Sequence, residues 1–304
     1  MNRKTLALTL TIIWSSAFLH HGCVLRSNIG KIADSDDIFP LWSGSAIAQD
    51  PRQIPFVKGM AHNTIHTATK GGYKFLHGAA ITNHNGIFFA NWANSPSNEN
   101  GPEETLQGRR SSDDCATWSH LETMGPGFDG PERHSHGVFL EHKNELWTIC
   151  ARFGEGAGAK KFDGLNAEAF VLNEQMNRWE SRGLVMQDCW PCDQPVTMVN
   201  GNYIVGGLNK DGLPVVAISR GGDLTAWDTI LIPYPLAMAP SFAETTVWAE
   251  GAQVLAIIRG GGGFAWAATS DDFGKTWKRA LKSNFPMPRS KAYLGKLISG
   301  QIYL

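Results

Sequence analysis

Pairs of short apolar or alternating runs, joined by tight turns, recur from His77 to Arg259. The turns fall at Asn85-Gly86, Lys143-Asn144, Asn200-Gly201 and Glu250-Gly251. Alternation with a period of two residues predicts strands, and a turn of this kind between two such runs predicts a β-hairpin. No stretch has helical periodicity long enough to lay helices over a sheet. The pattern therefore predicts an all-β chain.

Each predicted hairpin is followed by a third apolar strand and a tryptophan segment. The third strands read ETLQGRRSS, AEAFVLN, PVVAISR and FAWAATS, and the tryptophans are Trp118, Trp179, Trp227 and Trp277. A repeat of roughly 50 residues with about four strands is typical of β-propeller blades. Four blades and the opening strands of a fifth, AYLGKLISGQIYL, are expected over residues 49–304. Because an open ring exposes strand edges, either further blades complete the ring or residues of the N-terminal segment close it. We favour the first alternative and expect about six blades in the complete propeller, of which this chain covers about four and a half.

Two of the tryptophan segments share a second pattern. The segment SDDFGKTW ends at Trp277. The segment SSDDCATW has the same Ser, Asp, Thr and Trp spacing, with Cys115 in the glycine position, and SRGGDLTAW is a partial match. The pattern resembles the Asp box of sialidases and other propellers with bacterial neuraminidase repeats. The resemblance implies a sialidase-like β-propeller, in which the box is a turn whose Asp and Ser side chains bind backbone N–H groups. The box indicates the fold and says little about function.

Polar residues stand where the innermost strand of each blade should begin. They are His77, His136, Gln194, Glu244 and, in the partial blade, Lys291 or Tyr293. Such positions would be apolar if they only filled a core. Arg152 and Arg259 end second strands and should approach the same face. Carboxylate, imidazole and guanidinium groups together suit an acidic or hydroxyl-rich ligand such as a sugar.

The fourth blade, SFAETTVWAEGAQVLAIIRGGGGFAWAATSDDFGKTW, is similar to the sialidase passage that holds the catalytic glutamate and one carboxylate-binding arginine. The resemblance implies that Glu244 is that glutamate and Arg259 that arginine. In the family the glutamate polarises a tyrosine nucleophile, three arginines bind the sialic acid carboxylate, and an aspartate is the acid/base. The loop before the first Asp box holds Glu99, Glu103 and Glu104 but no aspartate, so a glutamate would replace it.

The first blade departs from the sialidase pattern. Sialidases open it with Arg-Ile-Pro, whereas YKFLHGAAI places Leu76 and His77 there. A histidine at this position is loosely similar to rhamnosidases and ulvan-type lyases, in which histidine carries the chemistry. Because imidazole titrates near working pH, His77 suits proton transfer. We predict Glu244 and His77 as catalytic residues.

Further substrate contacts are predicted around the second and third blades. The candidates, in addition to Arg259, are Arg133, His134, His136, Arg152 and Asp193. No metal and no cofactor are expected: His62 and His66 have a zinc-like spacing, but no helix is evident there.

Cys189 and Cys192 form a CWPC motif that is followed by a strand-like sequence. A redox-active CxxC needs a helix N-terminus behind it to stabilise the thiolate. The sequence therefore favours a loop disulfide or two unreactive thiols over a redox site.

Residues 1–48 read as a targeting segment. MNRK is basic, TLALTLTIIW is apolar but too short to span a bilayer, and cleavage is expected between Ala17 and Ala48. Cys23 offers a weak lipid-anchor signal. We expect export to the periplasm or the exterior, with no integral membrane segment after signal removal. A net charge of −1 without any Lys/Arg block argues against a nucleic-acid partner.

These features predict an exported, exo-acting glycoside hydrolase with a glycan substrate that carries an acidic sugar. One alternative is a polysaccharide lyase or rhamnosidase-type propeller that uses His77. Another is a non-catalytic glycan-binding propeller, because Asp boxes also occur in proteins that are not enzymes.

Overall fold

The computed structural model describes residues 37–44, 50–53, 59–69, 72–128, 132–154, 162–235 and 242–304. Most of the predicted targeting segment, with Cys23, lies outside these ranges, so the cleavage and the export stay predictions. Within the described ranges, no helix has both the length and the apolar character needed to cross a bilayer.

The first two blades are four-stranded antiparallel sheets in sequence order. Blade 1 consists of β1 (Phe75–His84), β2 (Ile87–Ser95), β3 (Thr105–Ser111) and β4 (Glu122–Gly125). Blade 2 consists of β5 (Arg133–His142), β6 (Glu145–Phe153), β7 (Asn166–Asn173) and β8 (Arg178–Gln187). Each blade is the predicted hairpin with a third and a fourth strand added on one side.

The next two blades follow the same order. Blade 3 consists of β10 (Val196–Thr197), β11 (Tyr203–Leu208), β12 (Pro214–Arg220) and β13 (Asp223–Leu231), with β9 (Trp190–Pro191) also paired to β11. Blade 4 consists of β14 (Thr245–Glu250), β15 (Gln253–Ile258), β16 (Phe264–Ser270) and β17 (Leu281–Pro286). A two-stranded sheet of β18 (Gly295–Lys296) and β19 (Ile302–Tyr303) comes after them, and a short 3-10 turn, η1 (Pro51–Gln53), precedes blade 1.

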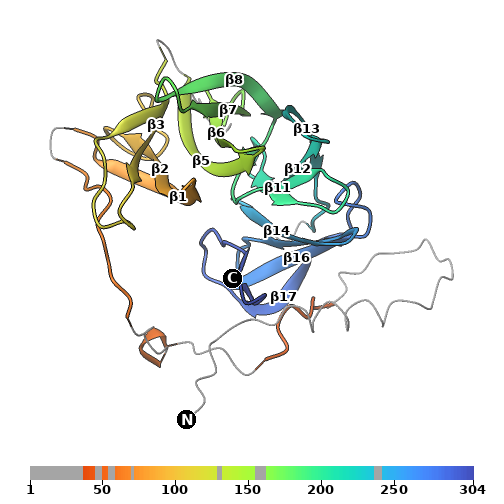
Figure 1. Ribbon diagram of the computed structural model, residues 1–304. Helices are drawn as coiled ribbons and strands as arrows, with labels where there is room; N and C mark the ends of the chain where they lie inside the picture. The colour runs from red at the N-terminus through yellow and green to blue at the C-terminus, as the bar shows by residue number, and fades with distance from the viewer. Residues whose placement is uncertain are drawn as a thin grey trace.

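The blades stand side by side in an arc, with β1, β5, β11 and β14 toward its centre and β8 and β13 toward its outside (Figure 1). This arrangement confirms the prediction of an all-β propeller with four-stranded blades. The end of the blades at which β1, β5 and β14 begin is called the site face below.

Apolar side chains fill the spaces between successive blades. Val138, Ile149 and Ala169 of blade 2 pack with Val205 and Trp227 of blade 3. Comparable clusters join blade 1 to blade 2 and blade 3 to blade 4. Because each blade buries one face against its neighbour, the site residues are carried on rigid elements.

The hairpin turns of blades 1 and 2 have a left-handed backbone at both turn residues. Asn85 and Gly86 have φ of 51° and 78°, and Lys143 and Asn144 have φ of 51° and 63°. Two successive residues with positive φ match the twist of the flanking strands. The turns thus fix the register of β1 on β2 and of β5 on β6.

Both Asp boxes form the hydrogen bonds that the resemblance implies. In the second box, Asp272 accepts hydrogen bonds from the backbone N–H and the hydroxyl of Thr276, at 2.8 and 2.7 Å. In the first box, Asp113 accepts the same pair from Thr117, at 2.9 and 2.6 Å. Cys115 takes the glycine position with φ of 66°, a conformation that costs a non-glycine residue free energy.

The CWPC motif contains two unreactive thiols. Cys115, Cys150, Cys189 and Cys192 are all unbonded in the described chain. Cys189 and Cys192 are buried, and burial raises the pKa of the Cys192 thiol to about 12. Of the two alternatives left by the sequence, the loop disulfide is therefore absent.

The segment 37–44 packs against blade 4, although the sequence places it in the targeting segment. Phe39 pairs in parallel with Ser283 of β17, and its N–H donates to the carbonyl of Lys282 at 2.8 Å. Leu41 is fully buried in a cluster with Leu255, Ile257 and other residues of blade 4. This segment thus covers the outer edge of blade 4.

Candidate functional site

His77 and His136 meet on the site face, where β1 lies against β5. Their rings are 5.3 Å apart between centroids and nearly perpendicular, at 84°. Gly78 permits this approach, because a Cβ atom there would lie 2.1 Å from Cγ of His136, and its φ is +64°. A β-bulge follows His77 in the pairing of β1 with β2, and such bulges redirect side chains near functional sites.

The His77 imidazole is largely buried and carries no charge at neutral pH. Burial, assisted by the positive charge of Lys291, lowers the pKa of His77 to about 4. Neither ring nitrogen has a hydrogen-bond partner within the described residues. Oε1 of Glu99 lies 4.0 Å from Nε2 of His77. His77 is therefore a neutral imidazole that can accept a hydrogen bond, but its pKa lies well below working pH, so it is a weaker base than the sequence predicts.

His136 forms the wall beside His77. It is 7% exposed, and its ring packs against Trp190 with centroids 4.7 Å apart. Burial, together with Lys291 and His77, lowers the pKa of His136 well below its usual value. A neutral, enclosed imidazole of this kind contributes shape and polarity to the site.

Glu244 and Arg259 form an ion pair at the start of blade 4. Glu244 immediately precedes β14 and Arg259 immediately follows β15, so the hairpin brings them together. Nη1 of Arg259 donates to Oε2 of Glu244 at 2.5 Å, and the two side chains are 25% and 15% exposed. The predicted proximity of these two residues is present, and both remain within reach of a ligand.

Asp193 is a buried residue whose carboxylate links blade 4 and the residues after it to the segment that leads into blade 3. It is 4% exposed and accepts hydrogen bonds from the hydroxyl of Thr246, the N–H of Leu294 and the N–H of Gln194. Burial raises the pKa of Asp193, which these hydrogen bonds and the charge of Lys291 oppose. The charge of Lys291 also helps to lower the pKa of His77 and of His136. Lys291 therefore acts on Asp193 and on the two histidines of blades 1 and 2.

Blade 2 carries a polar network centred on Glu168 of β7. His134 and Arg152 both approach its Oε2 at 3.0 Å, and the hydroxyl of Ser181 donates to Oε1 at 2.5 Å. Burial raises the pKa of Glu168, but the hydrogen bonds from His134 and Ser181 outweigh burial and lower it to about 2. Glu168 is therefore ionised and fixes the orientation of His134 and Arg152.

The two arginines of blade 2 already have partners. Arg152 donates to Glu132 at 2.6 Å and lies 4.4 Å above the ring of Phe128. Arg133 is 4% exposed, donates to the carbonyl of Asn100 and lies 5.4 Å from the ring centre of Phe153. Substrate binding by Arg133, His134 and Arg152 stays a prediction.

The three glutamates of the β2–β3 loop occupy different environments. Glu104 is fully buried and accepts a hydrogen bond from the N–H of Asn100 at 2.8 Å, and burial raises its pKa to about 7. Glu103 is exposed. Glu99 is the glutamate beside His77, with its side chain 61% exposed. Glu99 is thus the loop carboxylate that can reach a ligand at the site.

Sequence reasoning gave no role to Glu168, although a signal was available. It is the one charged residue in the third strand AEAFVLN, which is otherwise apolar up to its last residue, Asn173. A buried charge in such a strand needs partners from neighbouring strands, and His134 and Arg152 supply them here.

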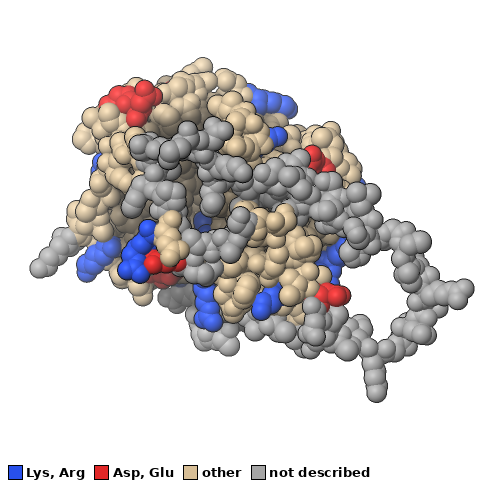
Figure 2. Space-filling view, turned by 90° about the horizontal axis from the view of Figure 1, so that it is seen from below, with Lys and Arg blue, Asp and Glu red and all other residues tan. Residues whose placement is uncertain are grey.

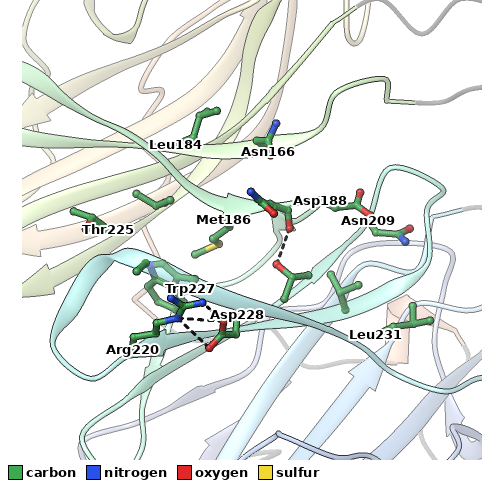
Figure 3. Close-up of a pocket in the computed structure, with 15 residues that line it drawn as sticks. Asn166, Leu184, Met186, Asp188, Asn209, Arg220, Thr225, Trp227, Asp228 and Leu231 are labelled. Carbon is green, nitrogen blue, oxygen red and sulfur yellow. Dashed lines mark hydrogen bonds and ion pairs between the residues drawn. The ribbon is translucent and has the colours of Figure 1, made fainter.

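A separate groove of about 650 Å³ lies between the outer strands of blades 2 and 3 (Figure 3). Arg220 and Asp228, which line it, are paired with each other at 2.7 Å. No residue predicted for the site lines this groove. On the face drawn in Figure 2, the basic and acidic groups of the described chain are interspersed and form no continuous basic patch.

Comparison with known proteins identifies the fold. No protein-family model and no curated protein matches the sequence. Among solved structures, the NanB sialidase of Streptococcus pneumoniae matches with a TM-score of 0.60 and 10% identity, over 84% of this chain and 60% of that one. The sialidase of Trypanosoma rangeli matches with a TM-score of 0.55 and 13% identity, over 79% and 43%.

A third match is the intramolecular trans-sialidase of Ruminococcus gnavus, with a TM-score of 0.57 and 10% identity, over 73% of each chain. The chain therefore spans 60% of the length of the NanB structure and less than half of the Trypanosoma structure. At such identities the likeness concerns the fold alone. The protein has the fold of the sialidase-like β-propellers.

Proposed function

We propose that this protein is an exported, glycan-active hydrolase that removes a terminal acidic sugar from a glycan. The observation that carries the proposal is the Glu244–Arg259 ion pair, 2.5 Å apart and partly exposed, on the face that also holds the neutral His77 and the exposed Glu99. The sialidase-like fold supports the glycan class of substrate.

The charges of the site favour an acidic sugar. Arg259 presents a guanidinium that can bind a sugar carboxylate while it retains one bond to Glu244. Lys291 adds a second positive charge whose field extends to His77. The carboxylate of the sugar loses hydration when it binds, and the two cations compensate for that loss.

The proton transfers of hydrolysis are assigned to Glu99 and His77. As the glycosidic C–O bond breaks, the Glu99 carboxyl gives a proton to the leaving oxygen. A water molecule then forms the new C–O bond and returns its proton to Glu99 or to the neutral His77 nearby. Glu244, on the blade-4 side, stabilises the positive charge that develops on the sugar ring or assists the group that attacks it.

A lyase is the second candidate, supported by the state of His77. A base that is already neutral at neutral pH can remove the proton beside a uronate carboxylate. The C–O bond to the next sugar then breaks, a double bond forms, and the leaving oxygen takes a proton. The product absorbs in the ultraviolet, unlike a product of hydrolysis.

Turnover on aryl glycosides of acidic and neutral sugars, and on uronate polysaccharides, tests these functions. Loss of acidic-glycoside cleavage in Glu244→Gln supports the hydrolase. In Arg259→Ala, KM should rise for acidic glycosides and not for neutral ones. An ultraviolet-absorbing product that is lost in His77→Ala would replace the hydrolase with the lyase. Glycan binding that survives both substitutions, without turnover by the protein, would leave a binding propeller.

A further inference from the structure

The loop between β2 and β3 carries Glu99 to within 4.0 Å of His77. Two turn hydrogen bonds shape the loop from within: the N–H of Gly101 donates to the carbonyl of Asn98 at 3.3 Å, and the N–H of Glu104 donates to the carbonyl of Gly101 at 3.1 Å. Loops are more mobile than the strands that they connect. The position of Glu99 therefore depends on what ties this loop to the blades.

Glu104 holds the peptide group that joins Glu99 to Asn100. Its Oε2 accepts a hydrogen bond at 2.8 Å from the N–H of Asn100, and this N–H belongs to that peptide group. Glu104 is fully buried and directly precedes β3, so its carboxyl is carried by the end of a strand. Because water does not compete at a buried acceptor, the hydrogen bond is stronger there than at the surface.

Arg133 holds the peptide group on the other side of Asn100. Its Nη1 donates to the carbonyl of Asn100. The guanidinium is itself fixed, because Arg133 is buried and lies 5.4 Å from the ring centre of Phe153, its pairing partner on β6. Asn100 has φ of 60°, a conformation that persists where the surroundings impose it. Glu104 of blade 1 and Arg133 of blade 2 thus fix the backbone immediately after Glu99.

The hydrogen bond from Asn100 does not require Glu104 to be charged. Burial raises the pKa of Glu104 to about 7, with a contribution from the charge of Glu99, while the Asn100 N–H and the charge of Arg133 oppose this shift. Both the ionised and the protonated carboxyl have an oxygen that accepts a hydrogen bond. A neutral amide of the same shape should therefore replace the carboxyl of Glu104 in this contact.

We infer that Glu104 is a positioning residue that holds Glu99 in place beside His77. The inference rests on the proposed function for the task of Glu99, which is to give a proton to the leaving oxygen. The placement of Glu99 rests on the hydrogen bonds and the burial of the loop alone. Glu103, the neighbour of Glu104 in the same loop, is exposed and supplies a matched control.

Two substitutions separate the hydrogen bond of Glu104 from its bulk. Glu104→Met keeps a long buried side chain and removes both oxygens, whereas Glu104→Gln keeps an oxygen that accepts from Asn100. Amide hydrogen exchange at Asn100, followed by NMR, should become about tenfold faster in Glu104→Met and stay unchanged in Glu104→Gln and Glu103→Ala.

Crystal structures of the same variants show where Glu99 lies without any need for turnover. The 4.0 Å contact between Glu99 and His77 should be lost in Glu104→Met and kept in Glu104→Gln. Unchanged exchange at Asn100 in Glu104→Met overturns the inference, as does a contact between Glu99 and His77 that this variant retains.

Turnover tests the purpose of this placement. A sugar leaving group needs a proton, whereas a nitrophenyl group departs readily as its anion. Glu104→Met should lower kcat about tenfold for a glycan and less than about twofold for a nitrophenyl glycoside, while Glu104→Gln stays close to the unmodified protein. Equal losses on both substrates would overturn the positioning role, because Glu104 would then support the fold in general. If the unmodified protein cleaves neither substrate, the proposed function fails, and exchange and crystal structures still decide the placement of Glu99.

Discussion

His77 meets His136 edge to face, with ring centroids 5.3 Å apart, and Gly78 is what allows the contact. The two imidazoles come from different blades, so their contact joins blade 1 to blade 2 at the site. A histidine beside a glycine with positive φ is a local pattern, but the partner ring comes from β5, 59 residues further along the chain. The geometry of the site thus depends on the packing of β1 against β5.

Gly78→Ala should damage both stability and the site. The added Cβ would lie 2.1 Å from His136 at a φ of +64°, so overpacking and backbone strain act together. We expect the free energy of unfolding to fall by about 2–4 kcal/mol in chemical denaturation. Gly86→Ala is the matched control, because its φ is +78° but nothing lies within 4 Å, and it should cost about 1 kcal/mol. Equal losses in the two variants would rule out the close approach.

His77 should make stability depend on pH in the acid range. Its pKa is lowered from 6.5 to about 4 in the folded state, so below pH 6.5 the unfolded chain binds a proton that the folded chain does not. Stability should therefore fall as the pH drops from about 6.5 to about 4, by about 2 kcal/mol for this group. Buried His136 acts in the same direction.

Denaturation of His77→Gln at pH 7 and pH 4 separates the contribution of His77 from those of His136 and the carboxylates. The variant should lose about 2 kcal/mol less stability on acidification than the unmodified protein. The same loss in both proteins would show that His77 titrates normally.

Cys115→Gly should stabilise the protein. Cys115 holds φ of 66° in the first Asp box, where the second box has Gly274 at 79°. Glycine adopts this backbone without the Cβ strain, so we expect a gain of about 1 kcal/mol in the free energy of unfolding. Asp114→Gly, at φ of 52°, is the control and should gain less because Asp tolerates this region. A loss of stability in Cys115→Gly would mean that the thiol contributes packing that outweighs the strain.

Leu41→Ala should destabilise the protein although it lies before residue 48. Leu41 is fully buried against blade 4, so its truncation should cost about 3 kcal/mol. Ile38→Ala, at a side chain that is 60% exposed, should change stability by less than about 0.5 kcal/mol. If neither variant affects thermal unfolding, segment 37–44 contributes nothing to the fold.

The local features of the fold could be predicted because their causes are local. Asn85-Gly86 and the Asp boxes fix their turns through their own φ angles and side-chain hydrogen bonds. The hairpin of blade 4 placed Glu244 next to Arg259 for the same reason: the two positions face each other across paired strands.

Other features depend on contacts between distant segments, which spacing does not encode. Nothing in the loop NENGPEE distinguishes Glu104, which is buried, from Glu99, which reaches His77. The charge of Lys291 helps to lower the pKa of His77, although the two residues lie far apart in the sequence. The packing of Leu41 on blade 4 was likewise missed, because the same residues fit the composition of a targeting segment.

The hydrogen bonds of Asp193 have a consequence for how the protein unfolds. Repeat proteins whose units touch only their neighbours can unfold one unit at a time. The Asp193 carboxylate, however, takes hydrogen bonds from Thr246 of blade 4 and Leu294 beyond it, while it belongs to the chain leading into blade 3. Loss of either donor would leave the buried carboxylate of Asp193 with one hydrogen bond fewer, which is costly for a buried charge. Blades 3 and 4 should therefore melt as a single cooperative unit.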